Sequence, residues 1–141
     1  MMFPRASLGL LLATVLTATS FMLSPPVSHA QPPLHQVKYT VFAEQPFADL
    51  AIYYREVDPP DWAAYSHNPY QFSPKANADV GPDNMWVMDV MLANPNDWAM
   101  VTAGTAGREQ TPNIHCVLAV DGVVVATDQG PKGALCSLRP W

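Results

Sequence analysis

Near the end of the chain stands Cys116-Val117-Leu118-Ala119-Val120-Asp121-Gly122-Val123-Val124-Val125-Ala126-Thr127, in which two runs of mostly apolar residues flank an Asp-Gly pair. Asp-Gly favours a two-residue type I′ turn, because both central residues of that turn need a positive φ. The sequence therefore predicts an antiparallel hairpin that turns at Asp121 and Gly122. A two-residue turn pairs Val120 with Val123 and Leu118 with Val125.

Period-two alternation predicts further strands in the same domain. Apolar side chains alternate with other residues in three segments: Val37, Tyr39 and Val41; Leu50, Ile52 and Tyr54; and Trp86, Met88, Val90 and Leu92. Shorter strands are expected at 98–102 and 134–138, with a turn at 94–97 before the first of them, and no helix is expected. Six or seven strands with frequent turns favour an immunoglobulin-like antiparallel β-sandwich of about seven strands over a small barrel.

The first thirty residues differ from the rest. Arg5 precedes an apolar run over residues 6–23, and small residues follow it up to Ala30. This layout is typical of a secretory signal peptide that is cleaved after Ala30. The sequence predicts a signal peptide over 1–30, with an uncleaved membrane anchor as the alternative, and a single domain over 31–141. We expect an extracytoplasmic protein, either secreted or associated with the cell envelope.

Charge and length exclude several classes of function. Residues 31–141 contain six basic and twelve acidic residues, which gives a net charge of −6 without a basic cluster. Proteins bind the phosphates of nucleic acids through Lys and Arg, so a nucleic-acid binder is excluded. The same residues contain no apolar run of the roughly 20 residues that a membrane-spanning helix needs. They are also too few for a multidomain enzyme.

The two cysteines of the chain, Cys116 and Cys136, both follow the predicted signal peptide. A pair of cysteines in an exported domain favours a disulfide. A metal-binding thiol pair or a redox couple is the alternative, but the sequence has neither additional ligands nearby nor the C-x-x-C spacing. Closing a loop of about twenty residues stabilises a fold by roughly 3 kcal/mol.

Four features of the chain occur together in a known family. They are Cys116-x-x-x-Val120-Asp121-Gly122-x-Val124 with a later Cys136, the strand Val37-x-Tyr39-x-Val41, the strand Ile52-x-Tyr54, and Trp86 at the start of the next strand. Over residues 35–57 and 84–138, the chain resembles mycobacterial MmpS proteins. The resemblance implies a non-enzymatic accessory subunit of an MmpL-type transporter of the resistance-nodulation-division class, which exports envelope lipids or siderophores. MmpS proteins keep an N-terminal membrane helix, whereas a cleavage site is predicted after Ala30 of this chain. A freely secreted binding module is therefore the second hypothesis.

The region 58–84 contains five prolines and no sustained periodicity, which predicts a long loop with at most a short strand. Its aromatic residues Trp62, Tyr65, Tyr70 and Phe72 have two interpretations. Because a long loop must bury surface to be ordered, we favour a cap that covers one end of the sandwich. Alternatively, the rings bind a lipid, another hydrophobic ligand or a partner protein, since rigid aromatics dominate binding interfaces.

Neither catalysis nor metal binding is predicted. No serine lies in a nucleophile-elbow motif, and the sequence indicates no orienting base for one. Asp79, Asp83 and Asn84 offer oxygen ligands, but calcium loops carry more carboxylates at regular spacing. Asp and Asn beside Gly-Pro are more commonly turn formers. We expect no catalytic residue, no metal and no cofactor.

Overall fold

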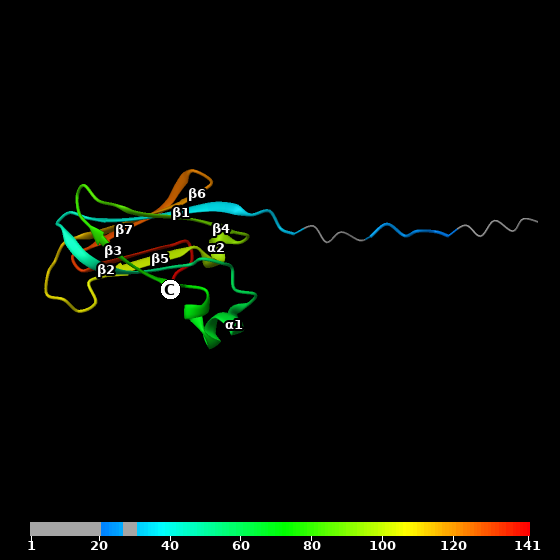
Figure 1. Ribbon diagram of the computed structural model, residues 1–141, viewed down its shortest axis with the longest axis horizontal. Helices are drawn as coiled ribbons and strands as arrows, with labels where there is room; N and C mark the ends of the chain where they lie inside the picture. The colour runs from blue at the N-terminus through cyan, green and yellow to red at the C-terminus, as the bar shows by residue number, and fades with distance from the viewer. Residues whose placement is uncertain (1–20, 27–30) are drawn as a thin grey trace, which may run out of the picture. The chain divides into compact units, whose positions relative to one another are not determined.

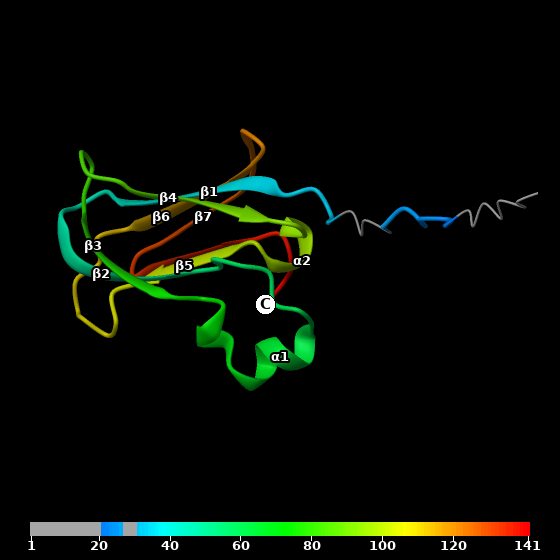
Figure 2. The same cartoon turned by 45° about the vertical axis from the view of Figure 1, so that its right-hand side comes forward.

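The computed structural model describes residues 21–26 and 31–141, and Gln31–Trp141 form one compact unit. Eight strands build two antiparallel four-stranded sheets that face each other (Figure 1; Figure 2). The strands are β1 (His35–Ala43), β2 (Phe47–Tyr54), β3 (Lys75–Val80), β4 (Trp86–Leu92), β5 (Met100–Gly104), β6 (Ile114–Val120), β7 (Val123–Gly130) and β8 (Gly133–Ser137). One sheet has the order β4-β1-β6-β7 and the other β3-β2-β5-β8. The predicted antiparallel β-sandwich is confirmed.

The core lies between the two sheets and consists of the alternating apolar side chains that the sequence indicated. In β1, Val37, Tyr39 and Val41 are all fully buried, while Gln36 before them and Lys38 between the first two are exposed. Strands β2, β4, β5 and β6 contribute in the same way, with the buried residues Leu50, Ile52, Val90, Leu92, Val101, Ala103, Ile114 and Leu118. Each such side chain stabilises the fold by about 1.5–3 kcal/mol through removal of apolar surface from water.

The hairpin of β6 and β7 has the backbone that an Asp-Gly turn requires. Asp121 and Gly122 have φ values of 50° and 81°, and Val120 pairs with Val123 as predicted. The predicted pairing of Leu118 with Val125 is wrong, because Leu118 pairs with Ala126. The register shifts by one residue after the turn, as happens where a β-bulge adds a residue to one strand.

A disulfide joins Cys116 in β6 to Cys136 in β8, with the two Cα atoms 6.1 Å apart. The predicted disulfide is confirmed. Because β6 and β8 belong to different sheets, the bond links the two layers of the sandwich. Both cysteines are buried.

The expectation of no helix is wrong. The structure has α1 (Trp62–His67), the 3₁₀ helix η1 (Pro69–Gln71) and α2 (Pro95–Trp98). Asp61 caps α1, since its carboxylate accepts the N–H of Ala64 at 2.7 Å. Proline occupies the first turn of η1 and of α2, where a missing N–H has no cost. Helices of one or two turns are too short to show a helical period of apolar residues in the sequence.

Two predicted boundaries change as a consequence. The region 58–84 contains β3, as its expected short strand, but also α1 and η1. The strand expected at 98–102 begins only at Met100, because the turn expected at 94–97 is the helix α2 and extends to Trp98.

The predicted signal peptide and its cleavage site after Ala30 fall largely on residues 1–20 and 27–30, which lie outside the described residues. Within the part of the chain that the structure describes, no helix combines the length and the apolar composition that crossing a bilayer requires.

Candidate functional site

Residues 55–74, which connect β2 to β3, form an excursion from the sandwich that we call the arm. The arm contains α1 and η1 and projects from the sheet of β2 and β5, on the side where the C-terminus lies (Figure 1; Figure 2). Two backbone hydrogen bonds close its base: Tyr54 N–H donates to Pro74 O at 3.3 Å, and Glu56 N–H donates to Phe72 O at 3.0 Å. The two ends of the arm are therefore tied to each other where they leave the sheet.

A second attachment comes from Asp58. Its two carboxylate oxygens accept the N–H groups of Ala93 and Asn94 at 2.9 and 2.7 Å. These two residues immediately precede α2, so Asp58 fixes the arm to the segment that carries Trp98. Charged acceptors make stronger hydrogen bonds than neutral ones, and the arm is stabilised accordingly.

Arg55, at the start of the arm, is fully buried. Its Nε donates to Trp98 O at 3.0 Å, and its Nη1 donates to Ser73 Oγ. Its Nη2 is buried without a hydrogen-bond partner. In the described part of the chain no carboxylate forms an ion pair with it. Because arginine stays protonated in proteins, the base of the arm contains a positive charge that no carboxylate neutralises.

Aromatic rings partly compensate that charge. The guanidinium carbon of Arg55 lies 4.3 Å from the ring centre of Tyr65, 5.4 Å from that of Trp141 and 5.7 Å from that of Trp98. The negative face of an aromatic ring attracts a cation over such distances. Burial raises the pKa of the nearby Tyr39 phenol, and this phenol donates to Arg55 O at 2.9 Å.

We call Trp62, Tyr65, Trp98 and Trp141 the aromatic cluster. Ring centres within it lie 5.3–6.2 Å apart, in the range of favourable aromatic pairs. Arg139 covers the cluster from outside, with its guanidinium carbon 4.3 Å from the centre of the Trp62 ring. The cluster packs the arm against α2 and the C-terminal segment.

A groove of about 310 Å³ lies between the arm and the sheet residues Tyr53, Met100 and Thr102. Seven residues line it: Tyr53, Tyr65, Pro69, Tyr70, Ser73, Met100 and Thr102. Tyr70 is 70% exposed, and its ring centre lies 5.9 Å from that of Tyr53. The groove therefore presents aromatic surface to solvent, as small-molecule sites commonly do.

The structure divides the four aromatic residues of the binding hypothesis into three situations. Trp62 and Tyr65 join the aromatic cluster, although Trp62 remains 49% exposed. Phe72 is buried, so it presents no ring face to a ligand. Tyr70 alone pairs with the sheet residue Tyr53 at the open groove. Packing of the arm and exposed aromatic surface thus overlap in Trp62, while Tyr65 belongs to the cluster and also lines the groove.

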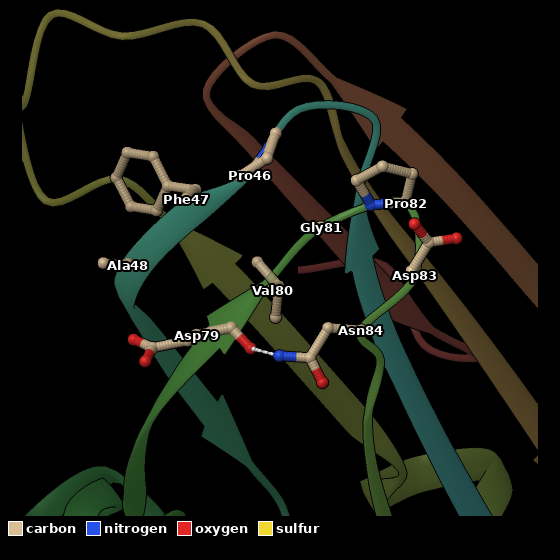
Figure 3. A pocket seen from close by; sticks show the side chains of 9 residues that line it. All are labelled: Pro46, Phe47, Ala48, Asp79, Val80, Gly81, Pro82, Asp83 and Asn84. Carbon is tan, nitrogen blue, oxygen red and sulfur yellow. Dashed lines mark hydrogen bonds between the residues drawn. The ribbon is translucent and has the colours of Figure 1, made fainter.

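The oxygen-bearing residues at the turn after β3 lie in a separate hollow, between that turn and the start of β2 (Figure 3). Asn84 Nδ2 donates to the backbone oxygen of Asp79 at 2.6 Å. The carboxylate of Asp79 accepts the N–H of Asp49 at 2.9 Å. The carboxylates of Asp79 and Asp83 point away from each other in Figure 3. Among the described residues, no group of three His, Cys, Asp or Glu side chains could hold a metal.

Sequence reasoning missed the residues that complete the site. Tyr53 and Met100 belong to predicted strands but have no pattern that distinguishes them as groove residues. Arg55 continues the alternation of β2 at a position that should point outward. The pattern therefore predicts exposure, yet Arg55 is fully buried. A lone arginine at the end of an apolar strand was the available signal.

The fold and the groove define a disulfide-linked β-sandwich domain with an aromatic arm. Residues 39–136 match the Rv2576c beta-sandwich domain, and the chain belongs to this family. It is 37% identical over 119 residues to uncharacterized protein Rv2576c of Mycobacterium tuberculosis strain H37Rv, and to the same extent to uncharacterized protein Mb2606c of Mycobacterium bovis. Each match covers 83% of this chain and 75% of the relative.

Proposed function

We propose that this protein is a non-enzymatic, extracytoplasmic binding module that holds a hydrophobic ligand in the groove beside the arm. The observation that carries the proposal is the open pair of rings, Tyr53 and Tyr70, at the groove wall. Tyr70 is 70% exposed on an ordered segment, and rigid aromatic surface of this kind favours binding. Export rests on the signal-peptide layout of residues 1–30.

A polarity-sensitive neutral dye, Nile red, tests this binding directly. Dye fluorescence should rise and shift to the blue on titration with the full domain, and Tyr70→Ala should weaken binding by about fivefold or more, since rim aromatics contribute on the order of 1 kcal/mol. Met91→Ala is the matched control, because Met91 is also an exposed apolar residue but lies on β4 of the other sheet. An equal loss in both variants, or no dye binding at all, would contradict the proposal.

A second role is the accessory subunit of an MmpL-type transporter of envelope lipids or siderophores. The arrangement Cys116…Val120-Asp121-Gly122…Cys136 favours it, since it resembles the C-terminal part of MmpS proteins. Cell fractionation separates the two roles. Retention in the membrane fraction together with a transporter supports the accessory role, whereas a species that begins at Gln31 in the culture medium supports the free binding module.

A further inference from the structure

The groove beside the arm continues along the outer face of the sheet. A neighbouring hollow of about 370 Å³ lies over β2 and β5, lined by Ala51, Tyr53, Lys75, Thr102, Ala103, Gly104 and Ala106. The two hollows share Tyr53 and Thr102. We treat the two adjoining hollows together as one trough, which is aromatic beside the arm and lined mostly by small residues over β2 and β5.

The charges at this trough are of one sign. Among the described residues that line it, none is acidic, and Lys75 contributes an ammonium group. Lys75 is the single charged side chain among these lining residues. Lys75 is exposed, so its charge is available to a bound molecule.

A second positive charge lies behind the trough wall at the arm. Three of the lining residues contact Arg55: Ser73 accepts from its Nη1, the Tyr65 ring covers its guanidinium, and Met100 O accepts its backbone N–H at 2.9 Å. The guanidinium itself is buried. Its positive potential reaches the trough through a low-dielectric wall, where charges interact more strongly than in water.

Ser73 lines the groove although it is only 5% exposed, and its hydroxyl can transmit that charge to a ligand. Its hydroxyl oxygen accepts a hydrogen bond from the Arg55 guanidinium, so its own proton remains to be donated. The structure shows no acceptor for this proton within the residues it describes. A hydroxyl that accepts from a cation is a stronger donor, because hydrogen bonds in a chain polarise one another.

From these observations we infer that the trough binds an amphiphile with an extended apolar body and one anionic group, a carboxylate or phosphate. The Ser73 hydroxyl and Lys75 recognise the anion, Arg55 acts through Ser73, and Tyr53 and Tyr70 contact the apolar body. The inference rests on the proposed binding function and names the chemical class of its ligand.

Calorimetric titration with three ten-carbon probes tests the inference, each probe kept below its critical micelle concentration. Decanoate and decyl phosphate carry an anion, and 1-decanol has the same chain without one. We expect both anions to bind about tenfold more tightly than decanol, the worth of one charge-assisted hydrogen bond. Equal affinities for the anions and decanol would overturn the inference.

Two variants locate the anion. Ser73→Ala should weaken anion binding about tenfold and leave decanol binding unchanged. Lys75→Gln should weaken it about threefold, as expected of an exposed charge. The control is Lys38→Gln, which removes an exposed lysine from β1 of the other sheet and should change neither affinity. Thermal unfolding of Ser73→Ala checks its fold, and Lys75→Gln tests the inference independently because its side chain is exposed.

Failure of this inference is distinguishable from failure of the binding function. If Nile red binding depends on Tyr70 but the probes show no preference for anions, the proposed hydrophobic site stands. The inference that its ligand is anionic is then overturned. Absence of both dye and probe binding overturns both. Anion binding that is lost in Lys38→Gln as much as in Lys75→Gln would show a non-specific charge effect and would also overturn the inference.

Discussion

The hairpin of β6 and β7 turns at two residues that are adjacent in sequence, whereas the arm is ordered by residues from distant parts of the chain. Asp121 and Gly122 supply the positive φ values that reverse the chain. The arm instead depends on Trp98 and Trp141, which lie far from it in sequence. The comparison shows that one small domain combines a locally determined element with one determined by tertiary packing.

The difference between the two regions extends to exposure. β7 is an edge strand with mostly exposed side chains, including Val123 and Val124. The arm, which has less regular structure, surrounds a fully buried arginine. Strand β7 is therefore held mainly by its hydrogen bonds to β6, whereas side-chain packing stabilises the arm.

The substitution with the largest expected effect on stability distinguishes the arm from the hairpin. Trp98→Ala removes the ring that contacts Trp62, Tyr65 and Arg55, and it should cost about 3–5 kcal/mol of unfolding free energy. Amide hydrogen exchange should accelerate in the arm, where Glu56 N–H is bonded to Phe72 O, more than in the hairpin. Val124→Ala in the exposed strand β7 is the control and should stay within about 0.5 kcal/mol. Equal acceleration in both regions would refute the idea that packing on Trp98 orders the arm.

Removal of the disulfide has the second-largest expected effect on stability. Replacing Cys116 and Cys136 together by Ala opens the loop between two residues whose sequence separation is 20. This should lower the unfolding free energy by about 3 kcal/mol. The melting temperature should fall by roughly 10–20 °C. Reductant should lower the melting temperature of the native protein and leave the double variant unchanged. No response of the native protein to reductant would show that the bond does not stabilise the fold.

Substitution in the hairpin turn should lower stability by a smaller amount. A Cβ added at Gly122 meets no atom within 4 Å, so any cost comes from the backbone alone. Gly122→Val should cost about 1–2 kcal/mol, since a β-branched residue resists the left-handed conformation. Gly122→Asn should cost clearly less, because asparagine tolerates positive φ. Equal unfolding free energies for the two variants in urea would show that the positive φ at Gly122 does not determine the cost.

The smallest expected effect is a pH dependence at the hairpin. Hydrogen bonds from His35, at 2.6 Å, and from Gln36 N–H lower the pKa of Asp121 below its ordinary value of 3.8. The unfolded state then binds more protons than the folded state, so stability rises with pH in this range. The contribution is present above pH 3.8 and is lost as the pH falls through the folded-state pKa. Asp121→Asn should reduce this slope in urea unfolding, and an unchanged slope would exclude Asp121 as its source.

The same comparison explains how far the sequence predicts this protein. Alternation at Val37, Tyr39 and Val41 identifies a strand and its buried face, because a period of two is local. The Asp-Gly pair identifies the turn for the same reason. The bulge that pairs Leu118 with Ala126 was not predictable, since it leaves the composition of the strand unchanged.

The site was less predictable than the fold. The sequence indicated an aromatic segment at 58–84, and Tyr70 does lie at the groove. It gave no reason to separate Tyr70 from Phe72, whose burial depends on the tertiary path of the arm. Arg55 could not be assigned to the interior, because the rings that surround it come from α1, α2 and the end of the chain.

The most direct test of the account is an amide NMR spectrum of the labelled protein with and without saturating decanoate. The account predicts that the largest shift changes occur at Tyr53, Ser73 and Thr102, which line the trough, and that the turn at Asp121 and Gly122 does not respond. Shift changes concentrated in the hairpin, or none at the trough under saturating probe, would contradict the assignment of the binding site to the arm.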